Sequence, residues 1–222
     1  MKIEGSSMTK AQEQVRPREQ QKQATRAKIL QAALDLFAER GFDGASIRDI
    51  AKRAGVFHGL IKYHFESKEE LWKSAVDYLF ERQSREMADP DGFDDLPARE
   101  QAHDWIKRYV HYCARHPEHA RIMVQESLRD TERLRWAVKT HIEPLHKTAR
   151  RITQRWIEAG VYPAIPLHAI IYMVSAAAQS PFMLAPELKH GAGINMSNPA
   201  QIDAYADALV TMLFEHSVQP EN

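Results

Sequence analysis

Hydrophobic residues recur at helical spacing along most of the chain. Between residues 25 and 40 the apolar positions fall three or four residues apart and so share one face of a helix. They are Ile29, Leu30, Ala33, Leu34 and Phe37. Long alternating runs of β-branched residues, which would predict strands, are missing, and glycine is sparse. Because Ala, Leu, Glu, Arg and Lys dominate the periodic segments, the pattern predicts an all-α chain.

Residues 46–65 contain two shorter periodic segments separated by a glycine. Ser46 and Asp49 form a capping box that begins one predicted helix, and Gly55 ends it. A second short helix is expected from about His58 to His64. Two short helices joined by a tight turn are the helix-turn-helix layout, whose second helix enters the major groove of DNA. The segment therefore predicts duplex DNA as a partner.

Longer helices are predicted beyond this segment. A second capping box, Ser67 and Glu70, begins the next helix, and residues 89–97 form a connection rich in Pro, Gly and Asp. Pro144 is expected to kink its helical region or to begin a new segment. Residues 186–199 are expected to form a flexible loop. The remaining predicted helices cover about residues 98–115, 117–128, 130–159, 166–185 and 199–217.

Charge and composition narrow the class of protein. The net charge is zero, but residues 1–66 hold 12 basic and 8 acidic side chains, against 18 and 22 in the rest of the chain. This distribution suits an electrostatic footprint for DNA that is confined to one end. A single cysteine, Cys113, excludes an internal disulfide. With neither an 18-residue apolar run nor an apolar signal core at the start, we expect a cytoplasmic protein without a membrane segment.

A specific set of residues extends over positions 25–72. It comprises Thr25-Arg26, 29–33, 36–42, 46–51, 54–56, Gly59, His64-Phe65 and 67–72. Their order and spacing resemble the N-terminal domain of the TetR family of bacterial transcription regulators. The resemblance implies an all-α homodimer with an N-terminal three-helix DNA-binding domain and a C-terminal helical bundle. In that family the bundle carries a ligand pocket, its last two helices usually form a four-helix dimer interface, and ligand binding typically releases the DNA.

The corresponding domain division has three parts. Residues 1–23, which are polar, are expected to form a flexible arm. Residues 24–70 would form the helix-turn-helix domain, and residues 71–222 the ligand-binding and dimerisation domain.

Nine residues are candidates for DNA contact. Arg48 can reach a phosphate or a base edge, and Gly59 lets the backbone approach phosphates. Thr25 is expected to offer its hydroxyl and a helix N-terminus to the DNA backbone. Phe57 either contacts a base or packs at the turn. The full set is Thr25, Arg48, Phe57, His58, Gly59, Leu60, Lys62, Tyr63 and His64.

The recognition helix departs from the common family pattern at three positions. The family often has Ser or Thr where this chain has Phe57, Thr at Leu60 and Tyr at Lys62. Leu60 can therefore contact a thymine methyl group instead of making a polar contact, and Lys62 supplies a point charge. The DNA sequence preference is therefore not carried over from the family.

Large apolar side chains in the C-terminal part supply candidates for a ligand pocket. A cavity between helices is the usual ligand site of a bundle, lined by apolar groups and a few polar ones. The predicted lining residues are Trp105, Tyr109, Met123, Trp156 and Tyr172. We expect a small, largely apolar ligand.

Residues 169–184 are apolar nearly all round, so this predicted helix must be buried on every side. A second copy of the chain supplies the additional surface most simply, and burial within one subunit is the alternative. The predicted homodimer interface consists of Tyr172, Ala176, Phe182, Tyr205, Leu209 and Leu213.

Enzyme chemistry finds little support in the sequence. Glu143 and His146 form one Glu-x-x-His, but di-iron bundles need two such motifs and further glutamates. No nucleophile elbow, phosphate-binding glycine loop or HExxH is present. We therefore expect no cofactor and no metal. The predicted function is a repressor released from a near-palindromic operator by a small ligand. The alternative is a helical-bundle ligand carrier or enzyme whose N-terminal domain only resembles a helix-turn-helix.

Overall fold

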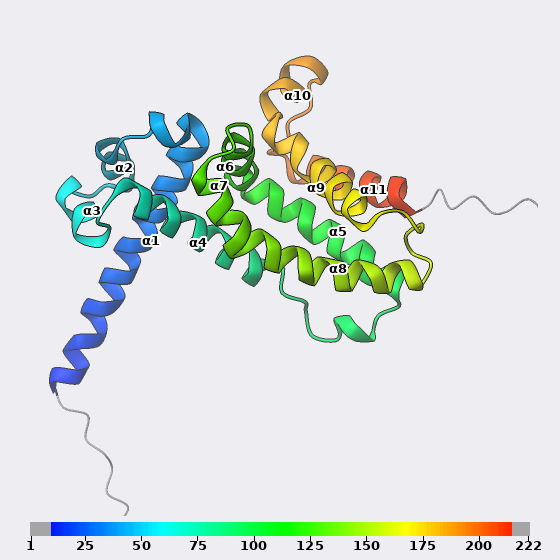
Figure 1. Ribbon diagram of the computed structural model, residues 1–222, viewed down its shortest axis with the longest axis horizontal. Coiled ribbons are helices and arrows are strands. Elements are labelled where there is room, and N and C mark those ends of the chain that lie inside the picture. Colours follow the sequence, from blue (N-terminus) through cyan, green and yellow to red (C-terminus); the bar gives the residue numbers. More distant parts are fainter. Residues whose placement is uncertain (1–9, 215–222) are drawn as a thin grey trace, which may run out of the picture. The chain divides into compact units, whose positions relative to one another are not determined.

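The computed structural model describes residues 10–214, and within them it contains helices and loops but no strand (Figure 1). The predicted all-α fold class is confirmed. The α-helices are α1 (Lys10–Gly44), α2 (Ile47–Ala54), α3 (His58–His64), α4 (Lys68–Glu86), α5 (Ala98–Arg115), α6 (Pro117–Ser127), α7 (Glu132–Ala137), α8 (Glu143–Glu158), α9 (Leu167–Met183), α10 (Ala185–Ala192) and α11 (Pro199–Phe214). A 3₁₀ turn, Phe93–Asp95, and a π segment, Val138–Ile142, complete the described elements.

The chain divides into two compact units after Ala75, within α4. The N-terminal unit contains α1, α2, α3 and the start of α4, and the C-terminal unit contains the rest. The predicted domain boundary lies five residues earlier, at residue 70.

The first helix is longer than predicted. It begins at Lys10 and not near Thr25, so residues 10–23 of the expected flexible arm are helical, while residues 1–9 of that arm lie outside the described residues. The Gln, Glu, Arg and Lys residues of this stretch are good helix formers, and they extend the helix toward the N-terminus. At its other end α1 is interrupted by Gly41, which has a φ of 71°. This glycine is the predicted helix stop, because a residue with a Cβ is strained at that angle.

The helix-turn-helix forms where the capping residues predict it. Oγ of Ser46 accepts a hydrogen bond from the backbone N–H of Asp49 at 3.1 Å, which caps the N-terminus of α2. Gly55 ends α2 in the left-handed conformation with a φ of 68°. The N-terminal unit closes over a core of fully buried side chains from all four helices, among them Ile29, Phe37, Ile50, Ile61 and Leu71. This packing fixes α3 against α1 and α2 and leaves its other face to solvent.

In the C-terminal unit, α5 packs against α8, α9 and α11 (Figure 1). Their apolar faces enclose one core that is rich in aromatic side chains. Its largest members are Tyr109, Tyr112, Trp156, Tyr162, Phe182 and Phe214.

The predicted helix over residues 130–159 is divided into three segments. α7 passes into the π segment Val138–Ile142, and α8 then begins with Pro144 in its first turn. Proline is tolerated there because the first N–H groups of a helix have no partner inside the helix. Pro144 thus begins a new segment, as one of the two sequence interpretations predicts.

The prediction of a flexible loop over residues 186–199 is wrong for the first half of that range. Residues 185–192 form α10, with Pro186 in the first turn. Gly193, with a φ of 68°, ends the helix and donates its N–H to the carbonyl of Leu188. The prediction took Pro and Gly as loop residues, whereas here they mark the two ends of a short helix.

The last helix begins at Pro199 as predicted and is described to Phe214, so residues 215–217 of the prediction lie outside the described residues. No single described helix has the length and apolar composition needed to cross a membrane. Only α9 and α10 taken together, which meet at a 69° bend, pass that test of length and composition.

Candidate nucleic-acid interface and ligand cavity

Helix α3 has one buried and one exposed face. Ile61 within it and Phe65 directly after it are buried in the core of the N-terminal unit. On the other face Phe57 and Tyr63 are 75% and 71% exposed, although both are large aromatic side chains. The exposed face is therefore available to a partner and unnecessary for the core. Neighbouring exposed or partly exposed residues on it are His58, Leu60, Lys62 and His64.

The position of the Phe57 ring depends on Gly59. A Cβ at position 59 would lie 2.8 Å from Cε1 of Phe57, closer than real Cβ contacts. The ring also lies 4.5 Å, centroid to centroid, from the ring of His58. Because Phe57 is exposed, burial at the turn does not account for it, and of its two sequence interpretations the exposed position favours contact with a partner.

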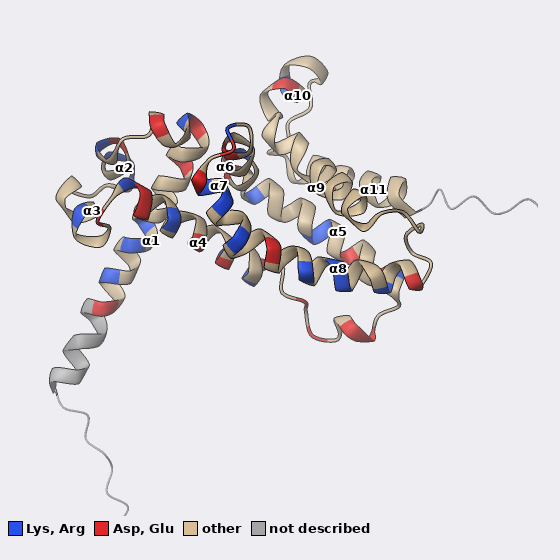
Figure 2. Ribbon diagram, in the orientation of Figure 1, with Lys and Arg blue, Asp and Glu red and all other residues tan. Residues whose placement is uncertain are grey.

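Helices α1, α2 and α3 each carry Lys or Arg residues (Figure 2), and these include two residues with exposed side chains and no acidic partner in the described chain. Both Arg48 on α2 and Lys62 on α3 are exposed, and neither forms an ion pair with any residue that the structure describes. By contrast, Arg53 forms two hydrogen bonds to the Glu39 carboxylate, at 2.6 and 2.8 Å. The paired charge is largely cancelled locally, whereas the two unpaired charges remain to attract phosphate.

The helix N-terminus predicted at Thr25 is wrong, whereas its contact with DNA stays a prediction. Thr25 lies in the interior of α1 and not at its start, so no helix N-terminus is present there. Its hydroxyl donates to the carbonyl of Gln21 at 2.9 Å. The sequence prediction failed because it placed the start of α1 too far along the chain.

The N-terminal half of α1 instead brings two basic residues beside α3. The ammonium group of Lys22 lies 5.8 Å from the ring centroid of Tyr63, and the guanidinium of Arg26 lies 5.4 Å from that of Phe65. Burial, followed by the positive charges of Lys22 and Arg26, lowers the pKa of His64. Sequence reasoning assigned no DNA contact to these residues. Their spacing of four positions on one helix face is the signal that could have identified them.

The C-terminal unit contains a cavity of about 590 Å³ between α4, α5, α8 and α9. Among the five predicted pocket residues, Trp105, Tyr109 and Trp156 line it. Met123 and Tyr172 do not: Met123 belongs to α6, and Tyr172 is 64% exposed on the outer side of α9. Helical periodicity identifies large apolar residues but does not distinguish a cavity wall from another face of the same helix.

Aromatic rings form one wall of the cavity. The Trp105 and Tyr109 rings are stacked at 5.1 Å, and Trp105 meets Trp156 edge to face at 6.4 Å. The Tyr109 hydroxyl accepts a hydrogen bond from Gln179 at 2.7 Å, and burial raises the pKa of this tyrosine. The wall is therefore fixed by packing before any ligand enters.

The predicted dimer-interface residues fall into two groups. Phe182 and Leu209 are 4% and 3% exposed and belong to the core of the chain, so they are not available at a surface. Tyr172 and Ala176 of α9 are exposed. Tyr205 and Leu213 are partly buried, and the Tyr205 hydroxyl donates to the carbonyl of Ala177 at 2.7 Å.

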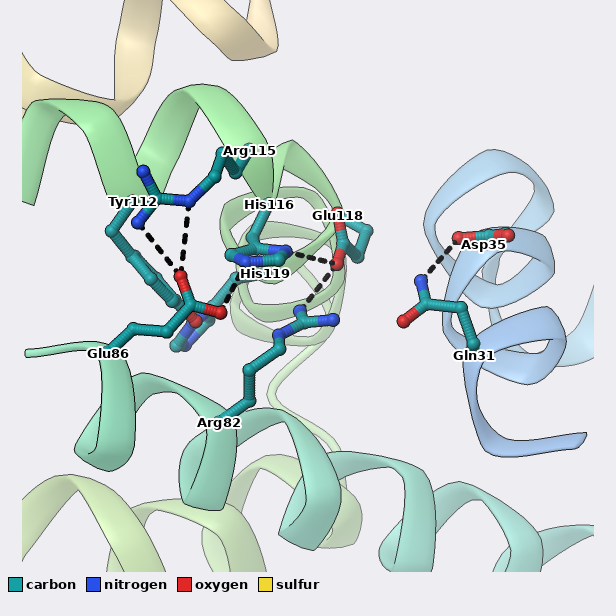
Figure 3. A network of polar contacts seen from close by, with 9 residues as sticks. All are labelled: Gln31, Asp35, Arg82, Glu86, Tyr112, Arg115, His116, Glu118 and His119. Atoms are coloured by element: carbon teal, nitrogen blue, oxygen red, sulfur yellow. Dashed lines mark hydrogen bonds and ion pairs between the residues drawn. The ribbon is translucent and has the colours of Figure 1, made fainter. Parts of the chain in front are cut away.

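A polar network joins α4 to the α5–α6 corner of the C-terminal unit (Figure 3). Arg82 and Glu118, both more than nine-tenths buried, form an ion pair at 2.5 Å. His116 contacts both Glu118, at 3.6 Å, and Glu86, at 2.8 Å. Burial alone would raise the pKa of Glu118, but hydrogen bonds from His116 and its own backbone, with Arg82, outweigh burial and lower it. The network holds charged groups in fixed positions inside a largely apolar unit.

No group of three or more His, Cys, Asp or Glu residues within the described chain is placed to hold a metal ion. In the one Glu-x-x-His, His146 lines the cavity and Glu143 is exposed. The His146 ring lies edge to face with Tyr172, at 5.9 Å.

Comparison with known proteins identifies the family. The family described as "Bacterial regulatory proteins, tetR family" matches residues 29–75. The family described as "YcdC-like protein, C-terminal region" matches residues 83–221, which is more than half of the chain. The chain belongs to the TetR family of DNA-binding transcriptional regulators. Because this family is not enzymatic, the alternative of a bundle enzyme is set aside.

Curated relatives match different lengths of the chain. The transcriptional repressor Rv3405c of Mycobacterium tuberculosis is 57% identical over 53 residues, covering 24% of this chain and 28% of that protein. The transcriptional repressor NicS of Pseudomonas putida is 35% identical over 112 residues, covering 50% and 52%. The regulator RutR of Escherichia coli is 25% identical over 174 residues, covering 78% and 81%. The chain therefore matches less than two thirds of the first two relatives.

Solved structures share the fold at low sequence identity. The ketosteroid transcriptional regulator KstR2 of Mycobacterium tuberculosis matches with a TM-score of 0.63 and 18% identity, over 84% of this chain and 91% of that chain. A TetR-like regulator from Rhodococcus sp. RHA1 matches with a TM-score of 0.60 and 19% identity, over 85% and 92%. At this identity the likeness concerns the fold alone.

Proposed function

We propose that the chain is a homodimeric repressor that binds a near-palindromic operator and is released from it by a small, largely apolar ligand. The observation that carries the proposal is the exposed face of α3, where aromatic and basic side chains are presented although the core does not need them. Two of the curated relatives, Rv3405c and NicS, are named as repressors, which supports repression over activation.

The DNA-binding residues of the proposal are those of the exposed α3 surface together with Arg48. Lys62 and Arg48 contact phosphates or base edges, and Phe57 and Leu60 supply apolar contacts to bases. Lys22 and Arg26 extend the positive surface along α1. In this arrangement phosphate contacts position the helix, and the residues facing the groove determine the sequence preference.

The dimer interface of the proposal is the face formed by exposed residues of α9 and α11. Tyr172 and Met173 of α9 are 64% and 61% exposed, and Met212 of α11 is 61% exposed. Ala176, Ala204 and Ala208 are exposed on the same two helices. Because α9 and α11 are in contact, exposed apolar side chains on both helices are consistent with an interaction surface. Two copies joined there would present two α3 helices to two half-sites of DNA.

The cavity of the C-terminal unit is the proposed ligand site. A bound ligand shifts the balance between a DNA-binding and a non-binding state only as far as its affinity differs between them. The first residues of α4 belong to the N-terminal unit, and its later residues line the cavity. We therefore propose that α4 transmits the effect of ligand binding to the DNA-binding helices.

Selection of duplexes from a random pool by the ligand-free protein tests the function. The expected result is enrichment of a near-palindrome with two half-sites, bound with an affinity that falls steeply with salt concentration. Absence of enrichment at low salt would contradict the proposal and favour a ligand carrier.

Charge-removing variants test the interface. Arg48→Ala and Lys62→Ala should each weaken binding to the selected site and reduce the salt slope by about one. Lys189→Ala, which removes one exposed positive charge from α10, is the matched control and should bind like the unaltered protein. Equal binding by all three variants would contradict the proposed docking surface.

A further inference from the structure

Two polar side chains in the cavity wall form no hydrogen bond with another residue of the described chain. Gln83 of α4 and Thr153 of α8 line the cavity and are only 8% and 6% exposed. Neither side chain forms a hydrogen bond with any described residue. Neither residue has a polar atom that is closed off from solvent without a hydrogen bond, so the amide and the hydroxyl open onto the cavity, where water meets them until a ligand enters. Groups that bind in the cavity can replace this water as hydrogen-bond partners.

The cavity wall carries little charge that could neutralise a bound ion. Its lining contains no Lys or Arg. The two lining carboxylates, Glu81 and Asp89, belong to exposed residues, and Asp89 already pairs with Arg108 at 3.1 Å. The lining histidines are His141 and the partly exposed His146, so an anionic ligand would lose its hydration without gaining a permanently charged partner, which is unfavourable.

The buried part of the wall contains no carboxylate that could bind a cation. Its polar atoms belong to Gln83, Thr153 and the aromatic residues. The histidine His141 is engaged with Asp77 at 2.8 Å. The inner wall is thus suited to an uncharged group that both donates and accepts hydrogen bonds, because a carboxamide and a hydroxyl can each do both.

We propose that the cavity takes an uncharged compound with an aromatic ring and one amide-like or hydroxyl group, and that Gln83 and Thr153 bind that polar group. The ring packs on the wall formed by Trp105, Tyr109 and Trp156. The inference rests on the proposed function, in which this cavity is the effector site, and it specifies the class of effector.

The test uses two compounds of the same shape that differ in charge. 2-Naphthamide is neutral and 2-naphthoate is an anion, and each is titrated into the full-length protein by calorimetry up to its solubility limit. The neutral amide should bind at least about tenfold more tightly, because the anion has no buried cation to pair with. Equal or tighter binding of naphthoate would overturn the proposal, and so would the absence of binding by both.

Substitutions in the wall test the two polar residues. Gln83→Leu and the nearly isosteric Thr153→Val should each weaken naphthamide binding roughly five- to tenfold, the loss expected for one hydrogen bond. Gln154→Leu changes the neighbouring exposed residue of α8 and should leave binding unchanged. Circular dichroism establishes whether each variant is folded. If Gln83→Leu does not fold, the binding measured for Thr153→Val decides the result. Unchanged binding by the folded wall variants contradicts the assignment.

The DNA selection experiment separates this inference from the proposed function. A protein that enriches a palindrome but prefers naphthoate retains its function and refutes the effector class. A protein that prefers naphthamide but enriches no duplex retains the cavity assignment and refutes the operator-binding function.

Discussion

Gly59 leaves the space beside the ring of Phe57, since a Cβ at position 59 would lie 2.8 Å from Cε1 of that ring. The ring is 75% exposed and therefore contributes little to the core. A glycine inside a seven-residue helix is unfavourable for helix formation. Gly59 thus lowers the stability of α3 but allows the Phe57 ring to lie where it does on the proposed DNA-binding face.

Gly59→Ala should separate stability from DNA binding. Alanine favours helix by up to about 1 kcal/mol over glycine, and the exposed Phe57 ring can rotate away from the new methyl group. We expect unchanged or increased thermal stability, measured by circular dichroism, together with weaker binding to the selected duplex, measured by fluorescence anisotropy.

The effect of Gly59→Ala on DNA should depend on the aromatic ring. Phe57→Ala alone should weaken binding, and adding Gly59→Ala to it should produce little further loss, because the displaced group is already absent. Fully additive losses would show that the methyl group itself obstructs DNA and that the ring position is irrelevant.

The buried pair Arg82 and Glu118 should be important for the stability of the C-terminal unit. Removing one member leaves the other charge buried without its partner. Arg82→Leu should therefore lower the free energy of unfolding by about 3–5 kcal/mol, measured by urea denaturation.

Replacing both members of this pair is the control. Arg82→Met combined with Glu118→Leu removes both charges while keeping similar volume, and its stability should be close to that of the original protein. If the double variant is as unstable as Arg82→Leu, packing and not charge accounts for the loss.

His119 should make folding stability depend on pH in the mildly acidic range. Burial, with the nearby positive charge of Arg82, lowers its pKa to about 3, and Nδ1 lies 2.9 Å from the Tyr112 hydroxyl. As the pH falls below the ordinary histidine value of about 6.5, the unfolded chain takes up a proton that the folded chain does not. The contribution of His119 to stability should therefore be complete above about pH 6.5 and be lost progressively from there down to about pH 3.

The measurement is the free energy of unfolding at several pH values for the unaltered protein and His119→Gln. In His119→Gln the free energy of unfolding should fall less steeply with decreasing pH. The difference in slope should be up to about 1.4 kcal/mol per pH unit, which is the contribution of one proton. The lowered pKa of His64 acts in the same range, and the lowered pKa values of Glu86 and Glu118 act below about pH 4.5, but both proteins share these groups, so the difference between their slopes from about pH 6.5 to 5 isolates His119. Identical slopes in both proteins would assign the pH dependence to other groups.

The local signals of the sequence predict the helix-turn-helix well. Ser46, Asp49 and Gly55 act through neighbours a few residues away, so capping chemistry alone defines the ends of α2. The start of α1 has no comparable signal, because its first residues favour helix without a cap that limits it. The misplaced start led directly to the wrong expectation of a helix N-terminus at Thr25 and to the omission of Lys22.

Long-range packing limits what the sequence predicts about the C-terminal unit. Phe182 and Tyr172 are both large apolar residues of α9, yet the first is buried and the second is exposed. The difference arises from where α5, α6, α8 and α11 contact α9, which a pattern within one helix does not contain. Gln83 and Thr153 were missed for a related reason, since their significance depends on burial and on missing partners.

The exposed face of α9 and α11 supplies the last prediction. Tyr172 and Met212 are more than 60% exposed in a single chain, so a charged residue at either position should not disturb the fold. In a dimer joined at this face the same charge would be buried without a partner, at a cost of several kcal/mol. Tyr172→Asp and Met212→Asp should therefore convert the dimer to monomer in light scattering while leaving helicity unchanged. Leu128→Asp, at an 82% exposed position after α6, is the control and should remain dimeric; dimers in all three variants would place the interface elsewhere.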